Sequence, residues 1–327
     1  MSTLALDATA LEKLVSAAVA APSIHNSQPW HFRLQPETSI LEVRAVRERA
    51  VPAADPQGRA MHISVGAAVL NLRVAARHLG WAPVVRLLPD PAEPDLFAGV
   101  RLDEASPVRL PGTEELYDAI WHRHSIRTPF TGRPVPADVL DQLVAAARVE
   151  GATLQLPDRQ ETARLLEITT EAERRSTTDP AQRAESRSWI RSGDQPPYGI
   201  PVRALGPQDR AGRLPMRDFS AIRPTEHQPF ASFEREPRIA VLTTEHDRPE
   251  DWLRTGLALE HVLLTATVHG VRASLLHQAM EWPHLRWTTR EPHQRPGHVQ
   301  MLVRLGYGPE GAPTPRLAAA DVLDRET

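Results

Sequence analysis

The segment Ala21–Trp30 reads Ala-Pro-Ser-Ile-His-Asn-Ser-Gln-Pro-Trp. Pro22 ends the helix that is predicted before it, because proline lacks a backbone N–H and clashes with the preceding turn. Pro29 favours an extended conformation for Gln28. The polar side chains between the two prolines suit two kinds of structure. One is a ligand-binding loop that presents hydrogen-bonding groups to the polar edge of a flat ligand. The other is a turn in which serine and asparagine bond nearby backbone groups.

The composition is that of a globular protein with a sizeable core. The chain has 327 residues, of which 41% are apolar and 24% charged, so it is long enough for two domains or one large one. A net charge of −3 without any basic run argues against a nucleic-acid partner. The chain has no cysteine, which excludes disulfides and thiolate metal sites.

Neither a membrane nor a metal is expected as a partner. No apolar segment reaches the length of a transmembrane helix, and the N-terminus lacks a basic region followed by an apolar one, so the expected location is the cytoplasm. His122 and His124 have the spacing of a metal-binding pair. No third ligand stands at a suitable spacing from them, so no metal site is predicted.

Apolar spacing predicts two long helices, at 60–79 and 252–269. Each is followed by a glycine, Gly80 or Gly270, in the position that favours a left-handed residue after a helix. Shorter helices are predicted after Asp7, from Thr113, over 137–149 and after Asp158. The predicted strands are 31–34, 39–46, 84–88, 97–102, 154–156, 239–243 and 299–306.

The segment from about residue 181 to 236 lacks periodicity and is rich in proline, arginine and glycine. Its prolines forbid long helices or strands. A stretch of this length inside a compact chain is typical of a lid, a wrapping segment or disorder. Its aromatic side chains favour a lid that packs against the rest of the molecule: Trp189, Tyr198, Phe219, Phe230 and Phe233.

The two long helices belong to an internal repeat. Gly66 matches Gly256, and Gly80 matches Gly270, both at an offset of 190 residues. Upstream, residues 11–18 resemble residues 140–147. We therefore expect two tandem halves, 1–110 and 111–327, that pack as a pseudo-dimer within one chain, with the lid inserted in the second.

The two halves have lost different motifs. The Pro-Ser loop stands in the first half only, since Gly151-Ala152 occupies its place in the second. The run Arg123-His-Ser-Ile-Arg127 belongs to the second half only. This complementary loss predicts one complete site that is assembled from both halves.

Two guanidinium groups and a hydroxyl occupy alternate positions just after a predicted helix, at Arg123, Ser125 and Arg127. An extended backbone would aim all three the same way, and arginine often binds phosphate through two hydrogen bonds. The alternative is a solvated basic helix end that is favoured by the helix dipole.

Together, the Arg-His-Ser-Ile-Arg run, the Ala-Pro-Ser-x-x-Asn-x-Gln-Pro-Trp segment and the long helix followed by a strand resemble the FMN-dependent nitroreductase superfamily. Members of that superfamily are homodimers with flavin at the subunit interface. The fused, half-degenerate arrangement is similar to the Acg-type branch. The resemblance implies an α+β fold of mostly antiparallel sheets wrapped by helices, with one FMN per chain. A monomer is compatible with it, because one chain supplies both halves of the interface.

The resemblance also implies roles for basic residues. Arg123, His124, Ser125 and Arg127 would hold the phosphate, the ribityl chain and the pyrimidine edge of FMN, with Arg127 mainly on the phosphate. Arg316, within Pro-Thr-Pro-Arg-Leu, matches a basic phosphate ligand near the C-terminus.

Further residues would lie at the flavin ring. Pro22, Ser23 and Asn26 would line the ring, with Gln28 supporting their loop. His277-Gln278 falls where many nitroreductases have Glu-Gly near flavin N5. This larger pair leaves less room for a nicotinamide, and no catalytic residue is assigned.

The expected function is that of an NAD(P)H-dependent flavin oxidoreductase with an occluded site, a small-molecule electron acceptor, and weak or absent nitroreductase activity. In such a protein, the cofactor carries out the redox chemistry and the protein tunes it. The alternative is a protein that sequesters or stores FMN without turnover.

Overall fold

Two long helices cross at the centre of the molecule. α2 (Arg59–His78) and α7 (Pro249–Val268) meet at Gly66 and Gly256. A Cβ atom on Gly256 would lie 2.1 Å from the carbonyl oxygen of Ile63, and one on Gly66 would lie 2.2 Å from that of Leu253. Glycine at both positions therefore allows the two backbones to touch. The computed structural model describes residues 6–104, 112–191, 197–218, 228–290 and 297–324.

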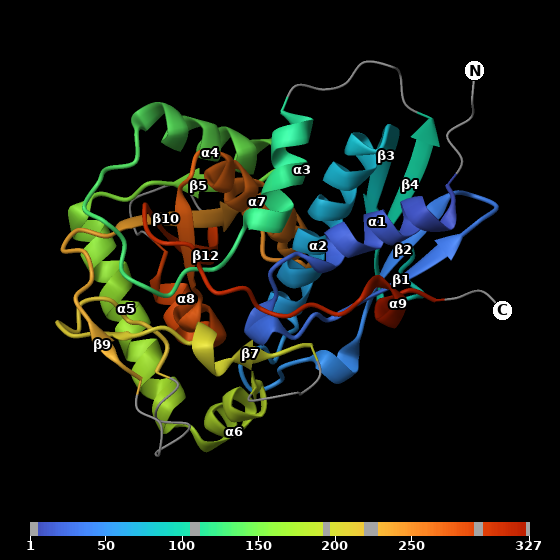
Figure 1. Cartoon of the computed structure of the whole chain (residues 1–327). Helices are drawn as coiled ribbons and strands as arrows, with labels where there is room; N and C mark the ends of the chain where they lie inside the picture. The colour runs from blue at the N-terminus through green and yellow to red at the C-terminus, as the bar shows by residue number, and fades with distance from the viewer. Residues whose placement is uncertain (1–5, 105–111, 192–196, 219–227, 291–296, 325–327) are drawn as a thin grey trace.

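The first sheet packs on one side of this helix pair (Figure 1). It is antiparallel and has the order β1-β2-β4-β3, built from β1 (Trp30–Gln35), β2 (Ile40–Ala45), β3 (Trp81–Leu87) and β4 (Leu96–Glu104). α1 (Ala8–Val19) begins at Asp7, whose carboxylate accepts a hydrogen bond of 2.8 Å from the Ala10 N–H. Gly80 follows α2 with a φ of +98°, so the predicted left-handed end is confirmed.

The second sheet lies on the other side of the helix pair (Figure 1). It is also antiparallel and has the order β11-β12-β10-β5, built from β5 (Thr153–Gln155), β10 (Arg238–Thr244), β11 (Arg272–Leu276) and β12 (His298–Gly306). α4 (Ala137–Val149) packs against β5 and α7, and α5 (Arg159–Thr178) follows β5 in the chain, whereas α3 (Thr113–His122) packs against both long helices. β11 was not predicted, and the fold is the expected mixture of helices and antiparallel sheets.

The two sheets have the same strand order relative to their helices. In the first sheet, β2 precedes the long helix α2 and lies between β1, which follows the shorter helix α1, and β4, the last strand of that sheet in the chain. In the second sheet, β10 precedes α7 and lies in the same way between β5, which follows α4, and β12, the last strand. All strands of the first sheet precede residue 105, and all strands of the second follow residue 152. The tandem halves remain a prediction that this equivalence supports. Their boundary at 110–111 lies outside the described residues.

The lid segment contains one helix that periodicity missed, α6 (Pro180–Ser188), which Asp179 caps. Beyond it, the described residues of the segment form a short 3-10 helix, η3 (Val202–Ala204), and four two-residue strands: β6 (Ile190–Arg191), β7 (Ile200–Pro201), β8 (Gln208–Asp209) and β9 (Phe230–Ala231). Trp189 and Phe233 are buried, as a packed lid requires. The expectation for Phe230 was wrong, because its side chain is 62% exposed, and Phe219 lies outside the described residues.

The chain finally returns from the second sheet to the first (Figure 1). After η5 (Gln278–Glu281), α8 (Pro283–Thr288) and β12, the C-terminal segment runs back to α9 (Ala319–Val322). There Leu323 pairs with Phe32 of β1 as an isolated parallel bridge. The terminal segment thereby passes the loop that follows α1. Among the described residues, no helix is long and apolar enough to span a membrane.

Candidate functional site

The loop after α1 has a strained backbone. η1 (Ile24–Asn26) begins it, and φ is +50° at His25, +53° at Asn26 and +51° at Gln28. The predicted extended conformation of Gln28 is therefore wrong. Pro29 disfavours only the right-handed helical region for the residue before it, and tertiary hydrogen bonds select the left-handed one. Positive φ at three non-glycine residues costs free energy and persists only where surrounding structure fixes it.

Asn26 joins three distant segments. Its side-chain amide donates to the carbonyl oxygens of Gly199 in the lid (2.9 Å) and Pro315 (3.0 Å). Its side-chain oxygen accepts a 2.8 Å hydrogen bond from Arg316. The Gly199 N–H also donates to the Asn26 carbonyl at 2.9 Å. Since all these partners are protein groups, Asn26 fixes the walls of the site.

Gln28 is fully buried and ties the same segments together. Its amide donates to the Pro197 carbonyl at 2.8 Å, and its oxygen accepts a 2.9 Å bond from the Leu317 N–H. The Ser23 hydroxyl oxygen accepts a 3.0 Å bond from the Gln28 N–H. Gln28 therefore links the loop to the lid and to the C-terminal segment, and its predicted supporting role at a flavin ring remains a prediction.

The Arg-His-Ser-Ile-Arg run is extended. Arg123 ends α3, Ser125 forms a parallel bridge with Ala273 of β11, and the Ile126 N–H donates to the Ala273 carbonyl at 2.8 Å. That Arg123, Ser125 and Arg127 point the same way remains a prediction. The run is held by the edge of the second sheet and is not a solvated helix end.

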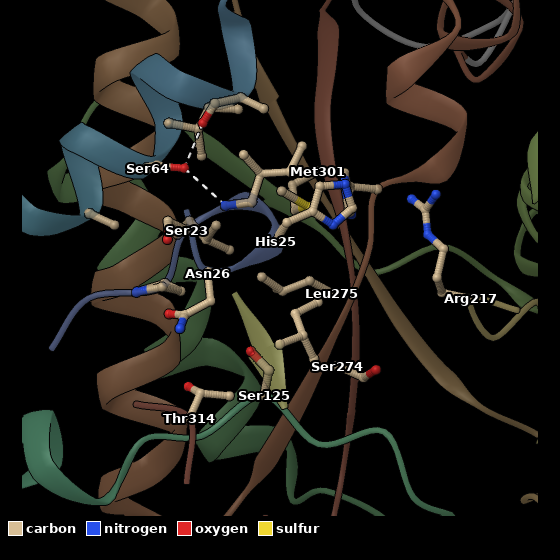
Figure 2. A pocket seen from close by; sticks show the side chains of 18 of the residues that line it. Ser23, His25, Asn26, Ser64, Ser125, Arg217, Ser274, Leu275, Met301 and Thr314 are labelled. Carbon is tan, nitrogen blue, oxygen red and sulfur yellow. Dashed lines mark hydrogen bonds between the residues drawn. The ribbon is translucent and has the colours of Figure 1, made fainter. Parts of the chain in front are cut away.

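A cavity lies between the strained loop and this run. It encloses about 1260 Å³, including the part that opens to solvent. Figure 2 shows Ser23, His25 and Asn26 on one side of it and Ser125 and Leu275 on the other. Gln28 is not one of the residues that line the cavity. The structure brings the other predicted site residues together as lining: Pro22, Ser23, Asn26, Arg123, His124, Ser125, Arg127, His277, Gln278 and Arg316.

One cationic group in the cavity consists of Arg123 and Arg316. Both donate to the carbonyl oxygen of Ala20, at 3.1 and 3.3 Å. Arg123 Nε also lies 3.2 Å from a carboxylate oxygen of Glu260, which is fully buried on α7. Burial, and then the nearby Arg123, lower the pKa of Arg316 to about 9. Two guanidinium groups that share one carbonyl form a natural anion site.

A second cationic group consists of Arg127 and Arg217. Arg127 donates to the Ala204 carbonyl at 3.0 Å, and burial, then Arg217, lower its pKa to about 10. Arg217, from the lid, is paired with Glu281 and Glu173. Burial alone would raise the pKa of Glu281, but Arg217 lowers it to about 2, so this carboxylate is ionised.

Two histidines border the second group. His277 Nε2 lies 2.9 Å from a carboxylate oxygen of Glu281. The ring of His25 meets that of His277 edge-on, with their centroids 6.4 Å apart. Burial, followed by the charge of Arg217, lowers the pKa of His25 to about 3, so it is neutral at physiological pH. His25 was not among the predicted site residues, although it stands within the decisive loop.

Arg59 is the second residue that sequence reasoning missed. It begins α2, is buried, and donates to the Gln300 carbonyl at 2.7 Å. Burial, and then Arg286, lower its pKa to about 10. No carboxylate pairs with it among the residues that the structure describes. A positive charge in the first turn of a helix is unfavourable to the helix dipole. This unusual position could have identified Arg59 as a candidate site residue from the sequence.

Five buried polar atoms in the cavity lining have no hydrogen-bond partner among the described residues. Two of them, Arg123 Nε and His277 Nε2, lie beside a carboxylate, and the other three are His25 Nε2, Gln278 Oε1 and Arg316 Nε. Gln278 uses its amide on the Pro215 carbonyl at 2.8 Å. Unpaired buried polar atoms are costly and indicate a missing partner. The described residues contain no cluster of three metal-ligating side chains, and the His122 ring bonds only the Asp118 carbonyl.

Comparison with known proteins confirms the predicted resemblance. The model described as "Nitroreductase family" matches residues 120–307, which is more than half of the chain. The Mycobacterium tuberculosis protein named "Putative NAD(P)H nitroreductase Rv3131" is 31% identical over 326 residues, covering 97% of this chain and 92% of that protein. Another from the same organism, "Putative NAD(P)H nitroreductase acg", is 30% identical over 304 residues, covering 92% and 89%.

A solved structure is also similar. The crystal structure titled as a putative nitroreductase from Anabaena variabilis has a TM-score of 0.47 at 13% identity, covering 91% of this chain and 88% of that one. The family match and the two mycobacterial relatives together place the sequence: this chain belongs to the nitroreductase family.

Proposed function

We propose that the chain binds one FMN in this cavity and is a flavin oxidoreductase that uses NAD(P)H. The observation that carries the proposal is that one cavity joins the Pro-Ser loop of the first sheet's half to the Arg-His-Ser-Ile-Arg run of the second. The phosphate is assigned to Arg123 and Arg316, because their guanidinium groups converge on one carbonyl. Arg127 lies in the other cationic group, which moves its proposed partner from the phosphate to the flavin ring.

The residues of the cavity fit a flavin. The isoalloxazine edge carries several hydrogen-bonding atoms, and the unpaired His25 Nε2 and Gln278 Oε1 are suited to meet them. Of the five arginines that line the cavity, Arg59, Arg127 and Arg316 have no carboxylate partner among the described residues. A buried unpaired charge is costly, so an anionic ligand is strongly favoured.

Bound FMN would supply hydride transfer, which no protein side chain provides. The chain's own residues hold the two ends of the ligand and keep water from its ring. His277, beside the ionised Glu281, is oriented toward the cavity wall where the ring is proposed to lie. Neutral His25 offers a hydrogen-bonding nitrogen without adding a further charge.

The lid restricts access to the site in this proposal. Ile200, Met216 and Arg217 of the lid line the cavity, and Pro197 and Gly199 bond the strained loop. Hydride transfer needs the donor carbon within about 3–3.5 Å of the acceptor atom. Side chains that occupy this space slow reduction by NAD(P)H, so weak or absent nitroreductase activity is expected. The same contacts favour the alternative that the chain stores FMN without turnover.

The test is the absorbance spectrum of the purified protein with and without NADPH. A flavin spectrum that bleaches under steady supply of NADPH and recovers with an acceptor supports the oxidoreductase. A flavin spectrum that NADPH leaves unchanged supports storage. A protein that takes up no FMN refutes both.

The lid's part in access is tested with two matched variants. Ile200→Ala removes a buried side chain from the cavity wall, while Val202→Ala removes one that is 38% exposed on the same segment and outside the lining. Faster flavin reduction by NADPH is expected for Ile200→Ala alone. Equal rates in both variants and the wild type would show that the lid does not limit access.

A further inference from the structure

Glu260 is a buried carboxylate that the proposed chemistry does not use. It lies on α7, fully buried, and neither of its carboxylate oxygens has a hydrogen-bond partner among the described residues. The only ion pair that the described residues give it is with Arg123, whose Nε lies 3.2 Å from Oε1. Arg123 is therefore the ion-pair partner of this carboxylate among the described residues.

The same guanidinium group also faces the cavity. Arg123 lines the cavity beside Arg316, and both donate to the Ala20 carbonyl. Arg123 therefore lies between two places for negative charge. Glu260 is on its buried side, and any phosphate held with Arg316 would be on its open side.

We propose that Glu260 positions Arg123 for the phosphate of FMN and takes up a proton when that phosphate binds. The inference rests on the proposed binding of FMN and adds a coupling between the ligand and solution pH. A phosphate dianion and a carboxylate that share one guanidinium group repel each other in a poorly solvated place. Transfer of one proton from solvent to the carboxylate removes that repulsion, and no other bond changes.

The surroundings of Glu260 make this transfer accessible near neutral pH. Burial raises the pKa of Glu260 to about 7, although Arg123 and then Arg316 oppose the rise. The charged groups that face it are these two arginines, on the segment after α3 and the C-terminal segment, and α2 contributes the uncharged Asn71. His261, next along α7, is paired with Glu150 instead.

His124 is the other titratable group at this end of the cavity. Burial, and then Arg123, lower its pKa, so it is neutral at pH 8 and could also gain a proton from a nearby phosphate. The experiment must separate the two groups, and a variant of each residue does so.

The measurement is the number of protons that accompany FMN binding to the apoprotein. Calorimetric titrations at pH 8 in two buffers of different ionisation enthalpy give this number directly. At pH 8 the phosphate, with a second pKa near about 6, is already a dianion and releases no proton. We expect an uptake of about 0.5–0.9 protons per FMN. Riboflavin, which has the same ring without phosphate, should bind with almost none.

Two variants assign the proton. Glu260→Gln keeps the side-chain shape, and FMN should then bind without proton uptake. His124→Gln should weaken FMN but retain the uptake. Equal uptake with FMN and riboflavin, persistence of uptake in Glu260→Gln, or its loss in His124→Gln would each overturn the proposal.

The wild-type comparison stands without the variants. If Glu260→Gln does not fold, the difference between FMN and riboflavin in the wild type still decides whether a phosphate-linked proton exists. FMN that binds without any uptake refutes this inference and leaves the proposed function intact. A protein that binds no FMN refutes both.

Discussion

The helix crossing makes a quantitative prediction about Gly256. In Gly256→Ala, the new Cβ atom would lie 2.1 Å from the Ile63 carbonyl oxygen and 2.8 Å from the Ala67 nitrogen, where ordinary contacts begin at 3.4 Å. Both neighbours are backbone atoms of α2 and cannot rotate away. The helices must separate by about 1 Å, and overpacking of this kind typically costs 1–3 kcal/mol.

We expect a loss at the upper end, about 3 kcal/mol in the free energy of unfolding, because the shift also disturbs the contacts on both sides of the crossing. Urea denaturation measures it, with a midpoint that falls by about 1 M if the slope is near 3 kcal/mol/M. Gly297→Ala is the matched control, since its Cβ would meet nothing closer than 3.6 Å. Equal stability of Gly256→Ala and the wild type would refute the close crossing.

Two further predictions concern charge. Arg316→Gln should weaken FMN binding by about tenfold or more, because it removes a charge-assisted bond of about 1.5–3 kcal/mol, while Arg127→Gln should weaken the binding of FMN and riboflavin alike. Fluorescence titration with both ligands measures these affinities. Equal losses of FMN and riboflavin affinity in Arg316→Gln would contradict the assigned phosphate site. Arg217 holds the pKa of Glu281 at about 2, against an ordinary 4.5, although burial opposes this. A carboxyl group whose pKa is lowered by folding stabilises the folded state above pH 4.5, and this stabilisation is lost as the pH falls towards 2. The difference in the free energy of unfolding between the wild type and Glu281→Gln, measured by urea titration, should therefore shrink from pH 4.5 to pH 2. A constant difference would contradict the ion pair.

The long helices and the cavity lining were predictable because their signals are local. Apolar spacing and the glycines after the helices placed α2 and α7 to within a few residues, and α4 matched the predicted 137–149. The residues of the Pro-Ser loop and of the Arg-His-Ser-Ile-Arg run meet at the cavity because each motif directly follows a helix, α1 or α3. β11 was missed because its sequence, Arg-Ala-Ser-Leu-Leu, shows no alternation of apolar and polar residues.

Other features depended on contacts that no local pattern carries. The φ of Gln28 follows from partners at Pro197 and Leu317, far along the chain, and the restriction from Pro29 alone allowed several conformations. His25 reads as one polar loop residue among several until its burial and unpaired nitrogen are seen. Arg217 stands in a segment without periodicity, so only the folded lid places it against Glu281.

The hydrogen bonds of Asn26 set an order of events during synthesis. The residues that it bonds lie 173 and 289 positions later in the chain. The first sheet is complete once β4 has emerged, but the partners that fix the strained loop arrive only with residues 315–317. At about 5–20 residues per second, a ribosome needs about 10–40 s to cover that distance. During this interval the loop lacks the partners that fix it, and we expect flavin to be captured only after residues 315–317 have been added.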